Sequence, residues 1–320
     1  MIDEKILAVF KKSKDEYVSG EDLSSQLGIS RAGIWKHIEK LRETGYDIEA
    51  SPHLGYRLIR VPDKLISEEI RWGLGTKILG KEIISYGKVD STNEIGYSLA
   101  EKGLKEGAVI FAEEQGKGKG RLGRTWASPP KGGIYLSCIL RPKMAPSEVS
   151  KITLAASVSV AAAVRELSGL QALIRWPNDI LVNGKKVCGI LTEMKAEQDT
   201  VDFLVIGIGV NVNTRETHLP EGASSLKEES GREVSRVELA KGILRNLEYN
   251  YVVLSKKGFS SIRKQWKGLT HMLGSRVKIS LPNRRFEGQA MDIDPDGALL
   301  VRLDTGFVER VSSGDVVIVR

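Results

Sequence analysis

Residues 115–126 read QGKGKGRLGRTW, four glycines interleaved with four cations, directly after a run of strand length. Gly118, Gly120 and Gly123 satisfy the G-x-G-x-x-G pattern, and residues 118–125 nearly match a Walker A loop with Arg124 in the lysine position. Both motifs require a helix directly after the loop. Here ASPPKGG and then a second strand-like run follow, which excludes the dinucleotide-binding and P-loop folds. The glycines and cations still favour a phosphate or a carboxylate as the ligand that this loop binds.

Hydrophobic periodicity divides the 320 residues into three parts, as expected for a chain of two or three domains. Residues 1–62 read as three short helices and a hairpin, and residues 63–269 alternate strand-length runs with longer helical patterns. Residues 270–320 contain short alternating segments separated by turns, which predicts a small β-barrel. The predicted fold class is therefore α+β and multidomain, with a winged helix-turn-helix, a central mixed sheet with helices and a C-terminal barrel.

The middle part carries most of the predicted regular structure. Strands are predicted at residues 108–113, 134–140, 173–176, 187–194 and 203–210, and helices at residues 93–102, 149–167 and 237–255. Residues 212–234 are polar and rich in turn residues, which predicts a mobile surface loop.

Composition limits the class of protein and its surroundings. The net charge is +7, and the excess lies within residues 63–269, because the first 62 and the last 51 residues each contain equal numbers of acids and bases. Two cysteines, Cys138 and Cys188, are too few for a disulfide framework or a thiolate zinc site. The N-terminus lacks the pattern of a signal peptide, and the apolar stretch 152–164 is shorter than a membrane span. We expect a soluble, cytoplasmic protein that does not enter a membrane.

The N-terminal segment GEDLSSQLGISRAGIWKHIEKL has the geometry of a helix-turn-helix. Ile34, Ile38 and Leu41 would face inward, and the outward positions of the same helix would face DNA. The candidate DNA-binding residues are Ser30, Arg31, Ala32, Trp35, Lys36 and Lys40, with Arg57 on the wing as a phosphate contact. The alternative is a three-helix packing module with a solvated charged face, which the zero net charge of this part favours slightly. That balance also predicts modest nonspecific affinity and a need for dimerisation on a palindromic site.

Three further clusters place polar side chains next to predicted strands. In RWPND, residues 175–179, Asn178 and Asp179 could orient a nucleotide or a metal-bound water, and Lys186 could bind a phosphate or a carboxylate. The glycines of GIGVN, residues 207–211, would let a ligand lie against the strand, although a bulged strand accounts for them equally well. In DSTN, residues 90–93, one side chain could cap a helix while the others face a ligand.

Two other patterns are rejected as sites. Residues 292–297 begin like a calcium loop, but Leu303 stands where a glutamate is required, so a hairpin turn is predicted. The histidines are too scattered for a metal site or a catalytic triad; they are His37, His53, His218 and His271.

Taken in order, these pieces resemble the bifunctional biotin protein ligases that also repress the biotin operon. The resemblance spans essentially the whole chain and rests on the helix-turn-helix, the short β C-terminus and the motifs at residues 90–93, 118–126, 175–179, 186–190 and 207–211. Members of that family usually carry Gly-Arg-Gly-Arg in the loop, where this chain has Gly118-Lys119-Gly120-Arg121. The lysine keeps the charge but lacks the planar fork of an arginine.

The resemblance implies a central sheet of the class II aminoacyl-tRNA synthetase and biotin ligase type, an SH3-like C-terminal barrel, and domains at residues 1–62, 63–269 and 270–320. It also implies ATP, biotin and Mg²⁺ as the reactants and cofactor. Biotin would contact Ser91, Thr92, Asn93, Gln115, Gly118, Lys119, Gly120, Arg121, Lys186, Gly189 and Gly207. ATP and the adenylate would contact Arg121, Arg124, Trp126, Asn178, Asp179, Lys186 and Asn211. Arg121, Lys186 and Arg124 would be catalytic, and Mg²⁺ would arrive with ATP, with Asp179 as its candidate protein ligand.

The implied reaction joins biotin to the α-phosphate of ATP and then transfers it to a lysine of the biotin carboxyl carrier protein of acetyl-CoA carboxylase. The implied regulation is repression at biotin operator DNA by a homodimer that biotinyl-5′-AMP induces. Two alternatives remain: a lipoate or octanoate ligase-type enzyme, and a ligand-sensing repressor without turnover. Gln115 and residues 91–93 favour a polar ureido head over a plain acyl chain, and Lys186, Arg121 and Asn178 argue against a pure sensor.

Overall fold

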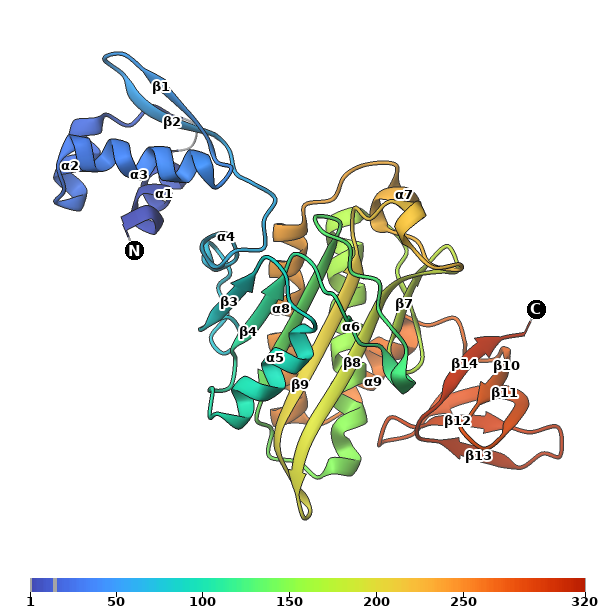
Figure 1. Ribbon diagram of the computed structural model, residues 1–320. Coiled ribbons are helices and arrows are strands. Elements are labelled where there is room, and N and C mark those ends of the chain that lie inside the picture. Colours follow the sequence, from blue (N-terminus) through green and yellow to red (C-terminus); the bar gives the residue numbers. More distant parts are fainter. Residues whose placement is uncertain (1, 14–15, 320) are drawn as a thin grey trace. The chain divides into compact units, whose positions relative to one another are not determined.

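The computed structural model describes residues 2–13 and 16–319 and divides the chain into two compact units, Met1–Lys64 and Leu65–Arg320 (Figure 1). Unit 1 consists of α1 (Ile2–Lys12), α2 (Gly20–Leu27), α3 (Arg31–Glu43) and the hairpin β1 (Asp47–Ser51) and β2 (Gly55–Arg60). Ile6, Phe10 and Ile34 are among the buried side chains that hold its helices together. The predicted winged helix-turn-helix is confirmed.

Capping side chains fix the turn between α2 and α3. The Ser19 hydroxyl accepts a hydrogen bond from Asp22 N at the start of α2, and the Ser30 hydroxyl accepts one from Gly33 N at the start of α3. Gly28 ends α2 with a φ of 68°, a left-handed conformation that glycine adopts without strain. These three residues give the short, sharp turn that sets α3 across α2.

Unit 2 is built around a seven-stranded mixed sheet in the order β3-β4-β5-β9-β8-β7-β6 (Figure 1). Strands β3 and β4 pair in parallel, and the other neighbours are antiparallel. The strands are β3 (Ile83–Tyr86), β4 (Val109–Ala112), β5 (Gly133–Leu140), β6 (Leu173–Arg175), β7 (Asp179–Val182), β8 (Lys185–Glu197) and β9 (Thr200–Asn211).

Helices cover both faces of this sheet. Helix α5 (Thr92–Glu101) crosses one face, and α6 (Val149–Ser168) and α8 (Arg236–Lys257) pack together on the other (Figure 1). The remaining helices of unit 2 are α4 (Ser67–Arg71), α7 (Leu226–Ser230), α9 (Ser260–Gly268) and the 3₁₀ turns η1 (Arg121–Gly123), η2 (Pro146–Glu148) and η3 (Glu216–His218). Within the described residues, Pro146–Ser168 is long and apolar enough to span a membrane, but 61% of its most apolar window is buried, as in a core helix.

The last part of unit 2 is a five-stranded antiparallel sheet in the order β13-β12-β11-β10-β14. Its strands are β10 (Arg276–Ser280), β11 (Arg285–Ile293), β12 (Leu299–Arg302), β13 (Val308–Val311) and β14 (Asp315–Ile318). Asp294 accepts hydrogen bonds from Asp296 N and Ala298 N in the turn between β11 and β12. This segment is therefore a hairpin turn, as predicted.

The structure also corrects the predictions. Residues 212–234 are not a plain surface loop, because they include η3 and α7 and bury Val212, Thr214, Ser225 and Leu226. Strands β3 and β7 have only four residues each, and α4 and α7 only five, which is too short for a periodic signal. Their positions are set by pairing and packing with neighbours that lie elsewhere in the sequence.

Candidate functional site

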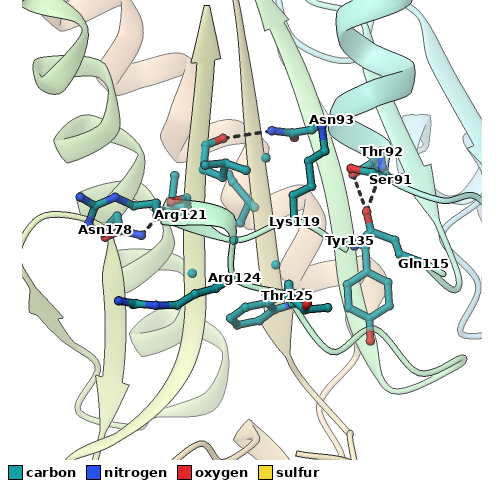
Figure 2. A pocket seen from close by; sticks show the side chains of 18 of the residues that line it. Ser91, Thr92, Asn93, Gln115, Lys119, Arg121, Arg124, Thr125, Tyr135 and Asn178 are labelled. Carbon is teal, nitrogen blue, oxygen red and sulfur yellow. Dashed lines mark hydrogen bonds between the residues drawn. The ribbon is translucent and has the colours of Figure 1, made fainter. Parts of the chain in front are cut away.

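One cavity collects almost all of the residues predicted to bind biotin and ATP. Its volume is about 110 Å³, and it lies over β5, β8 and β9, beneath the glycine loop (Figure 2). The predicted residues that line it are Ser91, Thr92, Asn93, Gln115, Lys119, Gly120, Arg121, Arg124, Trp126, Asn178, Asp179, Lys186, Gly189 and Gly207. Segments that are more than 100 residues apart therefore meet at one site.

Two predicted residues do not line the cavity. Gly118 lies within the loop, at a position where an added Cβ would approach the Trp126 carbonyl oxygen to 2.4 Å. Asn211 is buried, and its Nδ2 donates to the carbonyl oxygen of Ser224 at 3.0 Å. The absence of a side chain at Gly118 allows this close approach of Trp126, and the Asn211 side chain fixes the neighbouring segment at Ser224.

Glycines on two neighbouring strands make room for the side chains above them. An added Cβ at Gly207 would lie 2.2 Å from Asn93 Oδ1, and one at Gly209 would lie 2.5 Å from Trp126 Nε1. At Gly189 an added Cβ would meet the Trp126 ring at 3.0 Å. The glycines of residues 207–211 are therefore needed for close packing of Asn93 and Trp126, in a strand whose pairing with β5 is regular.

The end of the cavity near α5 is a buried hydrogen-bond network. Gln115 Oε1 accepts from Thr92 N at 2.8 Å, and Gln115 Nε2 donates to Ser128 Oγ at 2.8 Å. Ser137 Oγ donates to Asn93 Oδ1 at 2.6 Å, and Asn93 Nδ2 donates to Glu193 Oε2 at 2.7 Å. Figure 2 shows Ser91, Thr92 and Gln115 together at this end. Such a network fixes donors and acceptors at set positions, as recognition of a polar head group requires.

Each cation of the glycine loop has a partner on another segment. Lys117 pairs with Asp90 at 2.8 Å and Lys119 with Glu94 at 3.0 Å. Arg121 Nη1 donates to Asn178 Oδ1 at 2.7 Å, and Arg124 forms an ion pair with Asp315. The hydrogen bond to Glu94 raises the pKa of Lys119, whereas burial lowers the pKa of Arg121. The loop is thus fixed at four points, of which the Lys117 pair lies outside the cavity.

The backbone of the loop is less available than the sequence suggested. Gly120 N donates to the carbonyl oxygen of Arg124 at 2.7 Å, and Trp126 N donates to that of Gly118 at 2.8 Å. A small antiparallel bridge between Lys119 and Thr125 results. In this conformation the Gly120 N–H is already paired within the loop, and the side chains of Lys119, Arg121 and Arg124 are the cationic hydrogen-bond donors that line the cavity.

The opposite end of the cavity combines cations with a carboxylate. Lys186 Nζ lies 2.6 Å from Asp179 Oδ1 and 5.3 Å from the centre of the Trp126 ring, and Arg175 donates to Asp179 Oδ2 at 2.7 Å. Both oxygens of Asp179 are thereby engaged by cations. Among the residues that the structure describes, no three His, Cys, Asp or Glu side chains form a metal-binding group.

Several residues of the cavity were missed by the sequence reasoning. They are Thr125, Tyr135, Leu136, Ile190, Leu191, Ile208, Gly209 and Asp315. Gly209 belongs to the glycine-rich strand and could have been included. Tyr135 is 1% exposed, its hydroxyl donates to the Pro129 carbonyl oxygen at 2.9 Å, and burial raises its pKa. Asp315 lies in β14, more than 100 residues from the other motifs, and no local pattern marks it.

Replacing Asp315 with asparagine is expected to strengthen ATP binding slightly. The change removes a carboxylate that repels phosphates and holds Arg124, whose side chain is 61% exposed, so a gain of at most about threefold follows from a contribution below about 1 kcal/mol. Titration calorimetry with ATP measures the change in affinity. Asp304→Asn, in another turn of the same sheet, is the matched control, and a loss of a hundredfold would show that Asp315 contacts the nucleotide directly.

In unit 1, the predicted DNA-binding residues fall into two groups. Arg31, Ala32, Trp35 and Lys36 are exposed on α3, and Ser30 is used to cap that helix. Lys40 instead pairs with Asp3 of α1 at 2.7 Å, and Arg57 pairs with Glu49 at 2.6 Å above the Tyr17 ring. Arg31 also lies 3.9 Å from Glu21, so acidic side chains of the unit pair with three of the cations predicted to meet DNA.

Comparison with known proteins matches all parts of the chain. Residues 86–211 match the model of the Biotin/lipoate A/B protein ligase family, residues 3–57 that of an HTH domain, and residues 272–319 that of the Biotin protein ligase C terminal domain. The chain is 38% identical over 315 residues to the bifunctional ligase/repressor BirA of Bacillus subtilis (strain 168), covering 97% of each protein. It is 31% identical to BirA of Escherichia coli (strain K12), covering 98% of this chain and 95% of that one.

Solved structures agree with the sequence comparisons. The biotin protein ligase from Aquifex aeolicus in complex with biotin and ATP superposes with a TM-score of 0.65 at 31% identity. The match covers 75% of this chain and 99% of the Aquifex chain.

Proposed function

Because this chain belongs to the bifunctional ligase/repressor family of biotin protein ligases, we propose that its cavity binds biotin and ATP and forms biotinyl-5′-AMP. One observation carries the proposal: a buried network of hydroxyls and amides, from Thr92 to Gln115, opens into the same cavity as Arg121, Arg124 and Lys186. A neutral polar head group suits the first end. Two anions suit the second end, where a carboxylate would attack a phosphate.

The biotin half uses the network near α5. Ser91, Thr92, Asn93 and Gln115 would bind the ureido head. The donors and acceptors of Thr92, Asn93 and Gln115 are already oriented by Ser137, Ser128 and Glu193. The valeryl chain would lie over Gly207 and Gly189, and its carboxylate would reach Lys186. Lys119 is held by Glu94, so its main role would be to position the loop and not to contact biotin directly.

The ATP half uses the cationic end. Arg121 and Arg124 would stabilise charge on the phosphates, Trp126 would contact the adenylate, and Asn178 would orient Arg121. Lys186 would exchange its partner Asp179 for the reacting oxygens, and catalysis would consist of positioning and electrostatics. Magnesium would supply positive charge that stabilises the phosphates. Asp179, its candidate protein ligand, would have to leave Lys186 and Arg175 to hold it.

The second half-reaction would transfer biotin to a lysine of the biotin carboxyl carrier protein of acetyl-CoA carboxylase. The test is incorporation of labelled biotin into that carrier, with ATP present and with the acceptor lysine replaced by arginine as the control. We expect label only on the carrier that keeps its lysine. Formation of biotinyl-AMP without any labelled carrier would limit the activity to the first half-reaction.

Unit 1 would direct the same protein to biotin operator DNA as a homodimer.

The dimer surface would lie on the central sheet of unit 2. Beyond Gly189, β8 pairs with β9 as far as Glu197, whereas β7 pairs with β8 only between Lys185 and Gly189. In the described chain this leaves an open strand edge, of the kind that a second copy can pair with. Closure of the glycine loop over biotinyl-AMP would favour the dimer, and a two-fold operator would match it.

Asp3→Asn is expected to strengthen the nonspecific binding of DNA by unit 1. Burial alone would raise the pKa of Asp3, but hydrogen bonds from Lys40 and His37 lower it, so at neutral pH the carboxylate holds Lys40. Without that charge Lys40 can reach a phosphate, which adds about one unit to the slope of log affinity against log salt. Fluorescence anisotropy of the full-length protein with generic duplex DNA measures the slope. Glu16→Gln controls for net charge, and equal slopes for the two variants would argue against a contact by Lys40.

The remaining proposals concern organisation and location. We assign residues 1–62 to DNA binding, 63–269 to biotin and ATP, and 270–320 to support of the loop through Asp315 and Gly314. The protein would act in the cytoplasm, where its carrier and its operator lie. A lipoate ligase-type activity is disfavoured by the polar network at Gln115, and a sensor without turnover is disfavoured by the cations at the other end of the cavity.

A further inference from the structure

A second hollow lies directly beside the candidate active site. Its volume is about 160 Å³, and Arg121, Asn178, Ile190 and Leu191 line both this hollow and the first cavity. An interior space of about 150 Å³ accommodates a molecule as large as benzene. The second hollow can therefore hold one side chain, and it borders the place where the activated carboxylate would form.

Several segments make the walls of the hollow. They are Arg121 of the glycine loop, the start of α6 at residues 149–154, residues 176–178, residues 190–192 of β8, and the turns of the C-terminal sheet that contain Gly297, Ser312 and Ser313. Thr153 of α6 and Thr192 of β8 face each other with their hydroxyl oxygens 2.9 Å apart, and Leu154, Trp176 and Leu191 supply apolar surface. Ser312 and Ser313 are exposed. The walls thus combine hydroxyls with hydrocarbon and open towards solvent at the two serines.

The charge of the walls indicates what they could hold. Among the described residues that line the second hollow, Arg121 is the only charged one. Pyrophosphate would favour the first cavity instead, where Lys119, Arg121, Arg124 and Lys186 gather. A long aliphatic side chain that ends in an amine fits the hydrocarbon and hydroxyl walls. Close to the Arg121 guanidinium, such an amine favours its neutral form, which is the nucleophilic one.

Arg121 and Asn178 form a side-chain pair at the boundary of the two spaces. Arg121 Nη1 donates to Asn178 Oδ1 at 2.7 Å, Arg121 Nη2 donates to the Gly314 carbonyl oxygen at 3.2 Å, and Asn178 Nδ2 donates to the Ile190 carbonyl oxygen at 2.9 Å. Figure 2 shows Arg121 and Asn178 side by side at this end of the first cavity. A rotation of the Arg121 side chain towards a bound phosphate would join the two spaces.

We infer that the second hollow is the passage through which the acceptor lysine of the carrier protein reaches biotinyl-AMP. This inference rests on the proposed ligase function. The lysine nitrogen forms an amide bond with the carbonyl carbon of biotin, and the bond from that carbon to the phosphate oxygen breaks. AMP leaves with the electron pair, and the surplus proton of the amine passes to water through the open mouth at Ser312 and Ser313. Contact with the phosphate of the adenylate would turn the Arg121 side chain away from Asn178. The passage would therefore open only when the intermediate is present.

A graded series at Ser312 tests the passage. Ser312→Ala, Ser312→Leu and Ser312→Phe progressively fill its mouth, at an exposed turn where a larger side chain does not disturb the core. Thr305→Phe, in another exposed turn of the same sheet, is the matched control. Thr192→Val, which removes a wall hydroxyl at nearly constant volume, is a second and milder probe. Each protein is loaded with biotinyl-AMP and then mixed with a biotin carboxyl carrier domain or with Nα-acetyl-lysine methylamide.

We expect pyrophosphate release to be unchanged and single-turnover transfer to both acceptors to fall with the size of the side chain. Ser312→Phe should lose about tenfold or more, since misplacement of a reacting group by about 1 Å can cost about 10²-fold. Equal transfer rates across the series would overturn the inference. Slowing with the carrier alone would assign Ser312 to protein docking, and slower pyrophosphate release would assign the hollow to ATP. Absence of pyrophosphate release by the parent protein would instead refute the ligase function itself.

Discussion

Replacing Arg121 with glycine is expected to release biotinyl-AMP about tenfold to a hundredfold faster than the parent protein does. The guanidinium spans the glycine loop, Asn178 and the Gly314 carbonyl oxygen, and it closes one end of the cavity. A hydrogen bond that involves a charged group contributes about 1.5–3 kcal/mol, which corresponds to that range of rates. Stopped-flow displacement of the labelled intermediate by excess biotin and ATP measures the release.

Lys117→Gly is the matched control for this variant. It also replaces a cation of the same loop with glycine, but Lys117 pairs with Asp90 outside the cavity and is 77% exposed. Its release rate should stay within about threefold of the parent rate. If Arg121→Gly retained the intermediate as long as the parent does, the loop would not be the seal of the cavity.

Gly207→Ala is expected to reduce the affinity for biotin roughly a hundredfold. The new Cβ would stand 2.2 Å from Asn93 Oδ1, so the amide must leave its hydrogen bonds with Ser137 and Glu193. Loss of two buried hydrogen bonds costs about 2–3 kcal/mol, and the head-group end of the cavity loses its fixed geometry. Titration calorimetry with biotin measures the affinity, and circular dichroism confirms that the variant is folded.

Gly242→Ala provides the comparison on α8. There an added Cβ would meet Ala163 at 3.5 Å, an ordinary contact, so the same substitution should leave biotin binding unchanged and stabilise the helix by about 0.5–1 kcal/mol. Unchanged biotin affinity in Gly207→Ala would mean that Asn93 does not bind the head group, and the polar network would need another role.

The sequence predicted the elements of the fold where they are long and periodic. Strand β5 is buried throughout, and α6 presents an apolar face over five turns, so both have strong patterns. Motifs rich in glycine also pointed to the cavity, because a plain surface loop seldom interleaves glycines and cations so densely. The reason for the glycines was visible only in three dimensions: Gly207 and Gly209 lie beneath Asn93 and Trp126, which are distant in sequence.

Contacts between remote charged groups could not be predicted. Lys40 and Arg57 lie on outward positions where the sequence predicts contacts with DNA. Only the fold shows that they form ion pairs with Asp3 and Glu49. Asp315 joins the cavity because β14 is placed beside the glycine loop, a relation that no local pattern records. A short strand such as β7 depends on its neighbours in the same way, since its register with β8 brings Asp179 opposite Gly189.

Biotin-dependent release of pyrophosphate from ATP tests the proposed function most directly, because it needs no carrier protein and no DNA. Lipoate replaces biotin in the control, and omission of both acids gives the background. The joined polar and cationic ends of the cavity predict release with biotin and only background with lipoate. Tight binding of biotin without any release of pyrophosphate would contradict the ligase function and identify a ligand-sensing repressor.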